Sequence, residues 1–93
     1  MTGKTVFKRI IDREIPAKIV YEDDLCMAFE DIKPAAPTHL IVIPKKEIPS
    51  ANQVGQADEV IVGHLFVAMR KIAEQLGLSG GYRVVTNCGP DAG

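Results

Sequence analysis

Three polar side chains in this sequence are placed where the end of a strand could present them to a ligand. His39 opens an apolar stretch directly after a proline-rich turn, and imidazole can exchange protons near neutral pH. Asp31 lies between Phe29 and Ile32, so a carboxylate that could bind ribose hydroxyls stands beside side chains that could stack a base. Asn87 precedes a glycine-rich tail and could offer its amide to phosphate oxygens or a ribose hydroxyl. Each also has an ordinary interpretation, as a structural histidine, a strand end and a turn residue.

The remaining candidates favour structural roles. His64 has no carboxylate or second histidine four residues away to make a metal pair, which favours a packed or dimer-facing histidine. Cys26 and Cys88 are far apart, form no Cys-x-x-Cys pair and have no neighbouring positive charge, so they are interpreted as small buried hydrophobic residues. Residues 87–93 could bind phosphate through backbone N–H groups, but they lack the lysine and glycine spacing of the known phosphate loops. Turn chemistry is the default for this tail.

Helical and strand patterns alternate along the chain. Helical spacing of apolar residues predicts a short helix over residues 5–14, which Pro16 ends. A hairpin follows, with apolar runs at 19–21 and 25–29 around a polar turn. Residues 38–44 are apolar at nearly every position, which predicts a third strand covered on both faces.

The second half contains the longest element. Apolar residues recur at three- and four-residue steps over residues 58–76, which predicts an amphipathic helix with Gly77 as its C′ residue. Alternation over residues 82–87 predicts a fourth strand. The expected fold is therefore one α+β domain spanning residues 1–93, with an antiparallel sheet packed against the long helix.

Composition excludes several classes of partner. The 93 residues include 11 Lys and Arg against 12 Asp and Glu, a formal charge of -1, so no broad basic field exists for nucleic acid or an anionic membrane. No apolar segment is long enough for a membrane span, and no secretory signal follows the basic N-terminus. We expect a soluble, cytoplasmic protein.

Several sequence blocks together resemble the histidine-triad (HIT) superfamily, in its Hint branch of purine nucleoside phosphoramidases. The likeness spans Thr5 to Gly93 without an evident gap. Its blocks run from Phe7-Lys8-Arg9-Ile10-Ile11 through Ile15-Pro16-Ala17-Lys18-Ile19-Val20-Tyr21-Glu22-Asp23-Asp24 to Ala28-Phe29-Glu30-Asp31-Ile32, Ala36-Pro37-Thr38-His39, Gly63-His64-Leu65 and Gly81-Tyr82-Arg83-Val84-Val85-Thr86-Asn87.

The resemblance implies a HIT-like fold with five antiparallel strands, four of them within these residues, and a homodimer joined through the long helix and the fourth strand. It also implies binding of a purine nucleoside monophosphate. By position, His39 would buttress a nucleophilic histidine, and Asp31 would bond the ribose hydroxyls. The base would be enclosed by Phe7, Ile10, Phe29 and Ile32, and the phosphate would lie near Asn87 and Gly93.

One departure from the family is large. The signature of three histidines, each separated by one apolar residue, does not occur in the 93 residues, so we expect it on a fifth strand after Gly93, between the third and fourth strands. Relatives that bind structural zinc have a Cys-x-x-Cys near the N-terminus, and some have a histidine in place of Glu47. Because both features are absent, we expect no structural zinc, and the chemistry needs no cofactor.

The expected reaction is hydrolysis of a P–N bond between a purine nucleoside monophosphate and an amine, through a nucleotidyl-histidine intermediate. Two alternatives stay open. One is a non-catalytic nucleotide-binding or scaffolding dimer, and the other is a hydrolase of dinucleoside polyphosphates.

Overall fold

The computed structural model describes residues 5–92 and begins with a short helix, α1 (Val6–Ile11). The Thr5 hydroxyl caps this helix by accepting a hydrogen bond from the N–H of Lys8 at 3.1 Å. The helix predicted over 5–14 is thus confirmed but ends earlier, because Arg13 has the left-handed φ of 65°.

Three antiparallel strands form the sheet, in the order β1 (Ile19–Glu22), β2 (Cys26–Glu30) and β3 (Leu40–Pro44). The carboxylate of Asp23 closes the turn between β1 and β2. Its Oδ1 accepts hydrogen bonds from the N–H groups of Leu25 at 2.8 Å and Cys26 at 2.9 Å. The predicted hairpin and third strand are confirmed.

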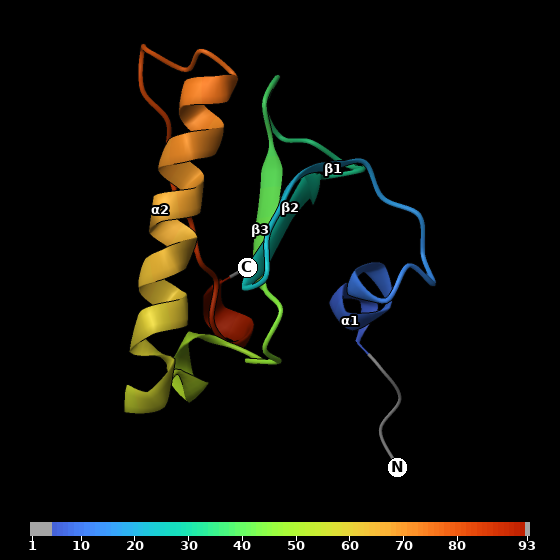
Figure 1. Ribbon diagram of the computed structural model, residues 1–93, viewed down its shortest axis with the longest axis vertical. Helices are drawn as coiled ribbons and strands as arrows, with labels where there is room; N and C mark the ends of the chain where they lie inside the picture. The colour runs from blue at the N-terminus through green and yellow to red at the C-terminus, as the bar shows by residue number, and fades with distance from the viewer. Residues whose placement is uncertain (1–4, 93) are drawn as a thin grey trace.

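The central strand, β2, is covered on both faces. Met27 and Phe29 point to one face, where they pack in a buried cluster with Ile10 of α1 and Ile43 of β3. The alternate residues of β2 point to the opposite face, toward the long helix α2 (Glu59–Gln75). Figure 1 shows the sheet between the two helices.

The long helix α2 follows β3 through two 3-10 turns, η1 (Ala51–Gln53) and η2 (Gln56–Asp58). It buries Ala68, Ile72 and Ala73. Gly77 ends it with a φ of 69°: its N–H donates to the carbonyl of Glu74 at 3.2 Å, and the N–H of Leu78 donates to that of Ala73 at 2.9 Å. The predicted helix and its C′ glycine are confirmed.

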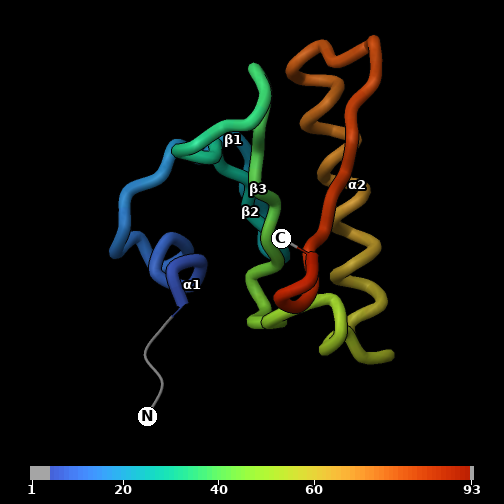
Figure 2. Tube along the Cα trace, turned by 180° about the vertical axis from the view of Figure 1, so that it is seen from behind, coloured from blue at the N-terminus to red at the C-terminus, as the bar shows by residue number. Residues whose placement is uncertain are grey.

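One strand prediction was wrong. Residues 82–87 form no fourth strand, and the described part of the chain has three strands and then a 3-10 turn, η3 (Pro90–Ala92). Figure 2 shows this segment running back along α2. Alternation indicates a tendency to extend, but a strand also needs a neighbouring strand for its backbone hydrogen bonds, and none of the strands within residues 5–92 lies beside 82–87.

The third strand, β3, is contacted on both faces as expected, through Ile41 and Ile43 in the core cluster on one face and by α2 on the other. As the edge strand of the described sheet it buries only Ile43, and its other residues are half-buried. Among residues 5–92, no helix has the length and apolar character needed to cross a membrane.

Candidate functional site

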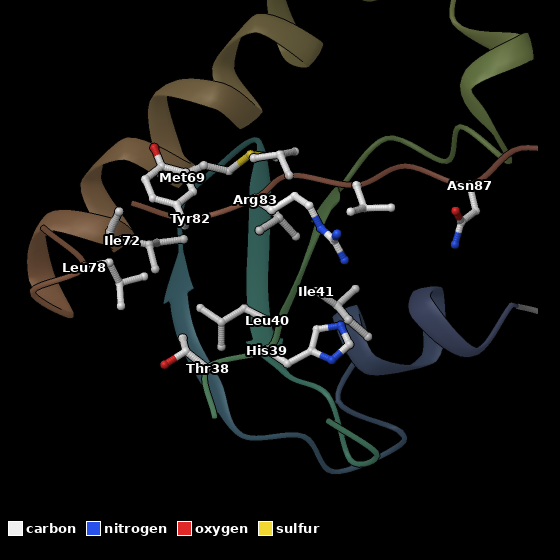
Figure 3. A pocket seen from close by; sticks show the side chains of 14 residues that line it. Thr38, His39, Leu40, Ile41, Met69, Ile72, Leu78, Tyr82, Arg83 and Asn87 are labelled. Atoms are coloured by element: carbon white, nitrogen blue, oxygen red, sulfur yellow. The ribbon is translucent and has the colours of Figure 1, made fainter. Parts of the chain in front are cut away.

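A cavity of about 330 Å³ separates β3 from residues 82–87. His39 and Leu40 line it on the sheet side, and Arg83 and Asn87 line it from the opposite segment. Figure 3 shows the His39 imidazole and the Arg83 guanidinium extending toward one another across this space, with Asn87 farther along the same segment. The cavity therefore joins a group that can exchange protons, a cation and an amide.

The imidazole of His39 is oriented by the backbone of the preceding turn. The N–H of Ala35 donates to its Nδ1 at 2.9 Å, so Nδ1 acts as an acceptor and a neutral ring carries its proton on Nε2. Nε2 lies 3.6 Å from Oδ2 of Asp31. This arrangement leaves Nε2 as the hydrogen-bond donor of the neutral ring.

Backbone pairing brings Asp31 and His39 together. The register of β2 and β3 ends with Glu30 opposite Leu40, and the N–H of Asp31 donates to the carbonyl of His39 at 3.1 Å. The two residues are therefore neighbours across the end of the sheet. The Asp31 carboxylate also accepts the N–H of Lys33 at 2.9 Å, which holds it in place at the strand end.

A second cavity, of about 590 Å³, lies beside the first and is more apolar. Phe7 of α1 lines it, and so does Asn87, which thus borders both cavities. The Phe7 ring is tilted against that of Phe29, with centroids 6.3 Å apart. Ile10 and Phe29 are buried in the core beneath it. Phe7 is 47% exposed, so part of its ring remains available to a planar ligand.

Among the predicted site residues, Phe7, His39 and Asn87 line these cavities, whereas Ile10, Phe29, Asp31 and Ile32 do not. Ile32 is 92% exposed and lies in the loop after β2, and Gly93 falls outside the described residues. Sequence reasoning missed Arg83, because it was assigned only to an alternating strand. Arg83 precedes Val85 by two residues and Asn87 by four, so the three side chains share one side of an extended segment, and this spacing is the signal that could have identified it.

His64 is the second histidine that the structure places in a specific contact. Its Nε2 lies 2.6 Å from Oδ2 of Asp23, so the partner comes from the β1–β2 turn, 41 residues away. The search for a metal pair compared His64 only with residues four positions away, so it could not have identified the contact with Asp23. Cys26 is buried, as predicted, whereas Cys88 is only partly buried.

The model of the HIT domain family matches residues 12–93. The chain belongs to the HIT family. An uncharacterised HIT-like protein of Synechococcus elongatus is 50% identical over all 93 residues, which cover 82% of that protein. The structural likeness is equally extensive. The solved HIT family hydrolase from Clostridium thermocellum has a TM-score of 0.94 and 41% identity, and the match covers all of this chain and 82% of that one.

A more distant HIT structure is the histidine triad nucleotide-binding protein from Candida albicans. It matches with a TM-score of 0.86 and 26% identity over 96% of this chain and 65% of that chain. The α+β HIT-like fold, with its antiparallel sheet and one long helix, is therefore established for this chain.

Proposed function

We propose that this HIT protein hydrolyses the P–N bond of purine nucleoside 5′-phosphoramidates, and that its site lies across the two cavities joined at Asn87. The observation that carries the proposal is this junction. One cavity contains His39 and the other contains Phe7, so polar groups suited to a phosphate adjoin an aromatic surface suited to a base. The names of the two solved relatives, a hydrolase and a nucleotide-binding protein, support both parts of the proposal.

The nucleophile would come from a further strand in the space between β3 and residues 82–87. Two features support such a strand. The cavity there is bordered by the edge strand on one side and by a segment with strand-like alternation on the other. Both borders leave backbone N–H and C=O groups without a neighbouring strand among residues 5–92. A strand inserted between them would pair with both and place alternate side chains next to His39.

In the proposed reaction a histidine of that strand attacks the phosphorus, and the P–N bond breaks as the amine leaves with a proton. Water then cleaves the phosphorus–histidine bond, which releases the nucleoside monophosphate and restores the imidazole. The Nε2–H of His39 would hold the nucleophilic ring by a hydrogen bond. Asn87 and Arg83 would supply an amide N–H and a positive charge to the phosphate oxygens.

In this proposal, Asp31 would accept hydrogen bonds from the ribose hydroxyls, because its carboxylate is only partly used by the Lys33 N–H. Phe7 would stack on the base above Ile10 and Phe29. Ile32 would reach the base only if the loop that carries it moved, since its side chain is now exposed to solvent.

The test is release of AMP from adenosine 5′-phosphoramidate by the full-length protein. His39→Gln should lower kcat by about 10² to 10⁴, and Asn87→Ala by about 10² to 10³. His64→Gln removes the second histidine of the 93 residues, which lines neither cavity, and serves as the matched control, with activity close to that of the parent protein. A parent protein that binds AMP but releases none from the phosphoramidate would refute the enzyme and leave a nucleotide-binding module.

We also propose that two copies associate through the outer face of α2. Val60 and Val67, one heptad apart, are 80% and 44% exposed on a helix whose inner face already packs on the sheet. Their spacing gathers apolar area on one side of the helix. Sedimentation should give a dimer for the parent protein and a monomer for Val60→Asp. A monomeric parent protein at micromolar concentration would contradict this assembly.

A further inference from the structure

Three side chains with different ligand chemistry, none of which lines either cavity, converge between the sheet and α2. One possible ligand atom each from Asp23, Cys26 and His64 lies within 4.8 Å of the others. They come from the β1–β2 turn, the first residue of β2 and the middle of α2. We propose that these three residues form a binding site for zinc or a similar thiophilic divalent cation.

The donor set determines the class of ion. Sulfur, imidazole nitrogen and one carboxylate oxygen together suit zinc, whereas calcium and magnesium prefer oxygen ligands alone. This site differs from the zinc site of relatives with a Cys-x-x-Cys near the N-terminus, because none of its residues belongs to that region. Three protein ligands would leave the fourth tetrahedral position to water.

The spacing of the ligand atoms is close to what a tetrahedral ion requires. Metal–ligand distances of 2.0 to 2.3 Å place neighbouring ligand atoms roughly 3.3 to 3.6 Å apart. The His64 Nε2 to Asp23 Oδ2 distance is 2.6 Å, so the ion would push these two atoms apart by about 0.7 Å. The Cys26 sulfur lies within 4.8 Å of one ligand atom of Asp23 and one of His64, so the adjustment required there is on the order of 1 Å or less.

The surroundings already hold the carboxylate in position. Asp23 Oδ1 is fixed by the N–H groups of Leu25 and Cys26, and Oδ2 accepts the hydroxyl of Tyr21 at 2.9 Å. Such outer contacts orient the ligands of metal sites. The Asp23 and His64 side chains are each about a quarter exposed, at 26% and 25%, so an ion can enter from solvent and reach the buried thiol beneath them.

Protons currently occupy the positions that the cation would take. Burial, followed by the negative charge of Asp23, raises the pKa of the Cys26 thiol to about 11, so the sulfur keeps its proton at neutral pH. On binding, the thiol proton would go to the buffer and the sulfur would bind as thiolate. The proton of His64 would move from Nε2 to Nδ1, so that Nε2 could bind the ion.

The test is a titration of the purified protein with Co²⁺, a spectroscopic substitute for zinc. We expect one equivalent to bind with a sulfur-to-cobalt charge-transfer band that Zn²⁺ then removes. Cys26→Ser should abolish the band, and His64→Gln should weaken Co²⁺ binding on the order of 100-fold or more. Cys88→Ser removes the other thiol and is the matched control, with band and affinity unchanged.

Circular dichroism of each variant separates a lost ligand from a lost fold, and the partly exposed His64 allows a decision even if Cys26→Ser does not fold. Absence of the charge-transfer band in the parent protein would overturn the proposal. So would a band that survives Cys26→Ser or disappears with Cys88→Ser. The contact between Asp23 and His64 would then be only a link between the hairpin and α2.

Discussion

Replacement of Asp23 by alanine should be among the most destabilising single changes outside the apolar core. Its two oxygens accept four hydrogen bonds, from the N–H groups of Leu25 and Cys26, the Tyr21 hydroxyl and His64 Nε2. A hydrogen bond to a charged group contributes about 1.5 to 3 kcal/mol, but the exposed donors regain water after the change. The backbone N–H of Cys26 is buried, so it regains little hydrogen bonding with water. We therefore expect a loss of about 2 to 4 kcal/mol.

Asp24→Ala provides a control at the next position. The Asp24 side chain is exposed, and no hydrogen bond or ion pair joins it to another residue between 5 and 92. Its replacement should change the free energy of unfolding by about 0.5 kcal/mol or less. Urea unfolding followed by circular dichroism at pH 7, without added metal ions, gives both values. If Asp23→Ala and Asp24→Ala differed by less than about 1 kcal/mol, the assignment of the hairpin's stability to this carboxylate would be wrong.

The same contribution should depend on pH in a defined direction. Burial alone would raise the pKa of Asp23, but hydrogen bonds from His64, Leu25, Cys26 and Tyr21 outweigh it and keep the pKa well below its usual range. A lowered folded-state pKa stabilises the fold at pH values above the unfolded-state pKa of about 3.9. The stability difference between parent and Asp23→Ala should be constant from about pH 5 to 7 and decrease as the pH falls below 4. A difference that grew on acidification would contradict the sign of this shift.

Three further substitutions test the packing and the helix ends by urea unfolding. Met27→Ala, at a fully buried position, should cost about 2 to 5 kcal/mol, and more than the same change at half-buried Met69. Gly77→Ala should cost about 1 to 2 kcal/mol because the φ of Gly77 is 69°. Gly80→Ala is the control and should cost less, because Gly80 has no positive φ. Equal costs would rule out backbone strain as the cause. Thr5→Ala should cost about 1 kcal/mol and reduce the protection of the α1 amides against hydrogen exchange.

Local sequence signals predicted the elements whose stabilising contacts are local. The helix ending at Gly77 and the hairpin closed by Asp23 both depend on residues within a few positions of one another. The error at residues 82–87 has the opposite origin. Alternation identified a segment able to extend, but whether it becomes a strand is decided by a partner that is distant in sequence. Because no strand of residues 5–92 pairs with the outer side of β3, this strand lies at the sheet edge and most of its residues are half-buried.

The candidate site was also predictable only where local sequence signals were enough. His39 and Asn87 were identified from their places at the ends of apolar stretches, and the fold brings them to one cavity. The contact of His39 with Asp31 follows from strand register, which alternation alone does not specify. His64 was assessed only against neighbours on its own helix, so its contact with Asp23 could not be predicted. That contact depends on how α2 lies across the sheet.

The central strand β2 separates the proposed metal site from the proposed reaction site. Cys26 begins this five-residue strand and Asp31 follows its last residue, so the two sites lie roughly 15 Å apart along it. That separation exceeds the screening length of about 8 Å at physiological ionic strength. The two sites also face different neighbours, α2 at one end and the turn before His39 at the other. Zinc bound at Cys26 should therefore leave the kcat for AMP release unchanged while raising the unfolding temperature. If zinc inhibited hydrolysis equally in the parent and in Cys26→Ser, the inhibiting ion would be bound in the cavities beside His39.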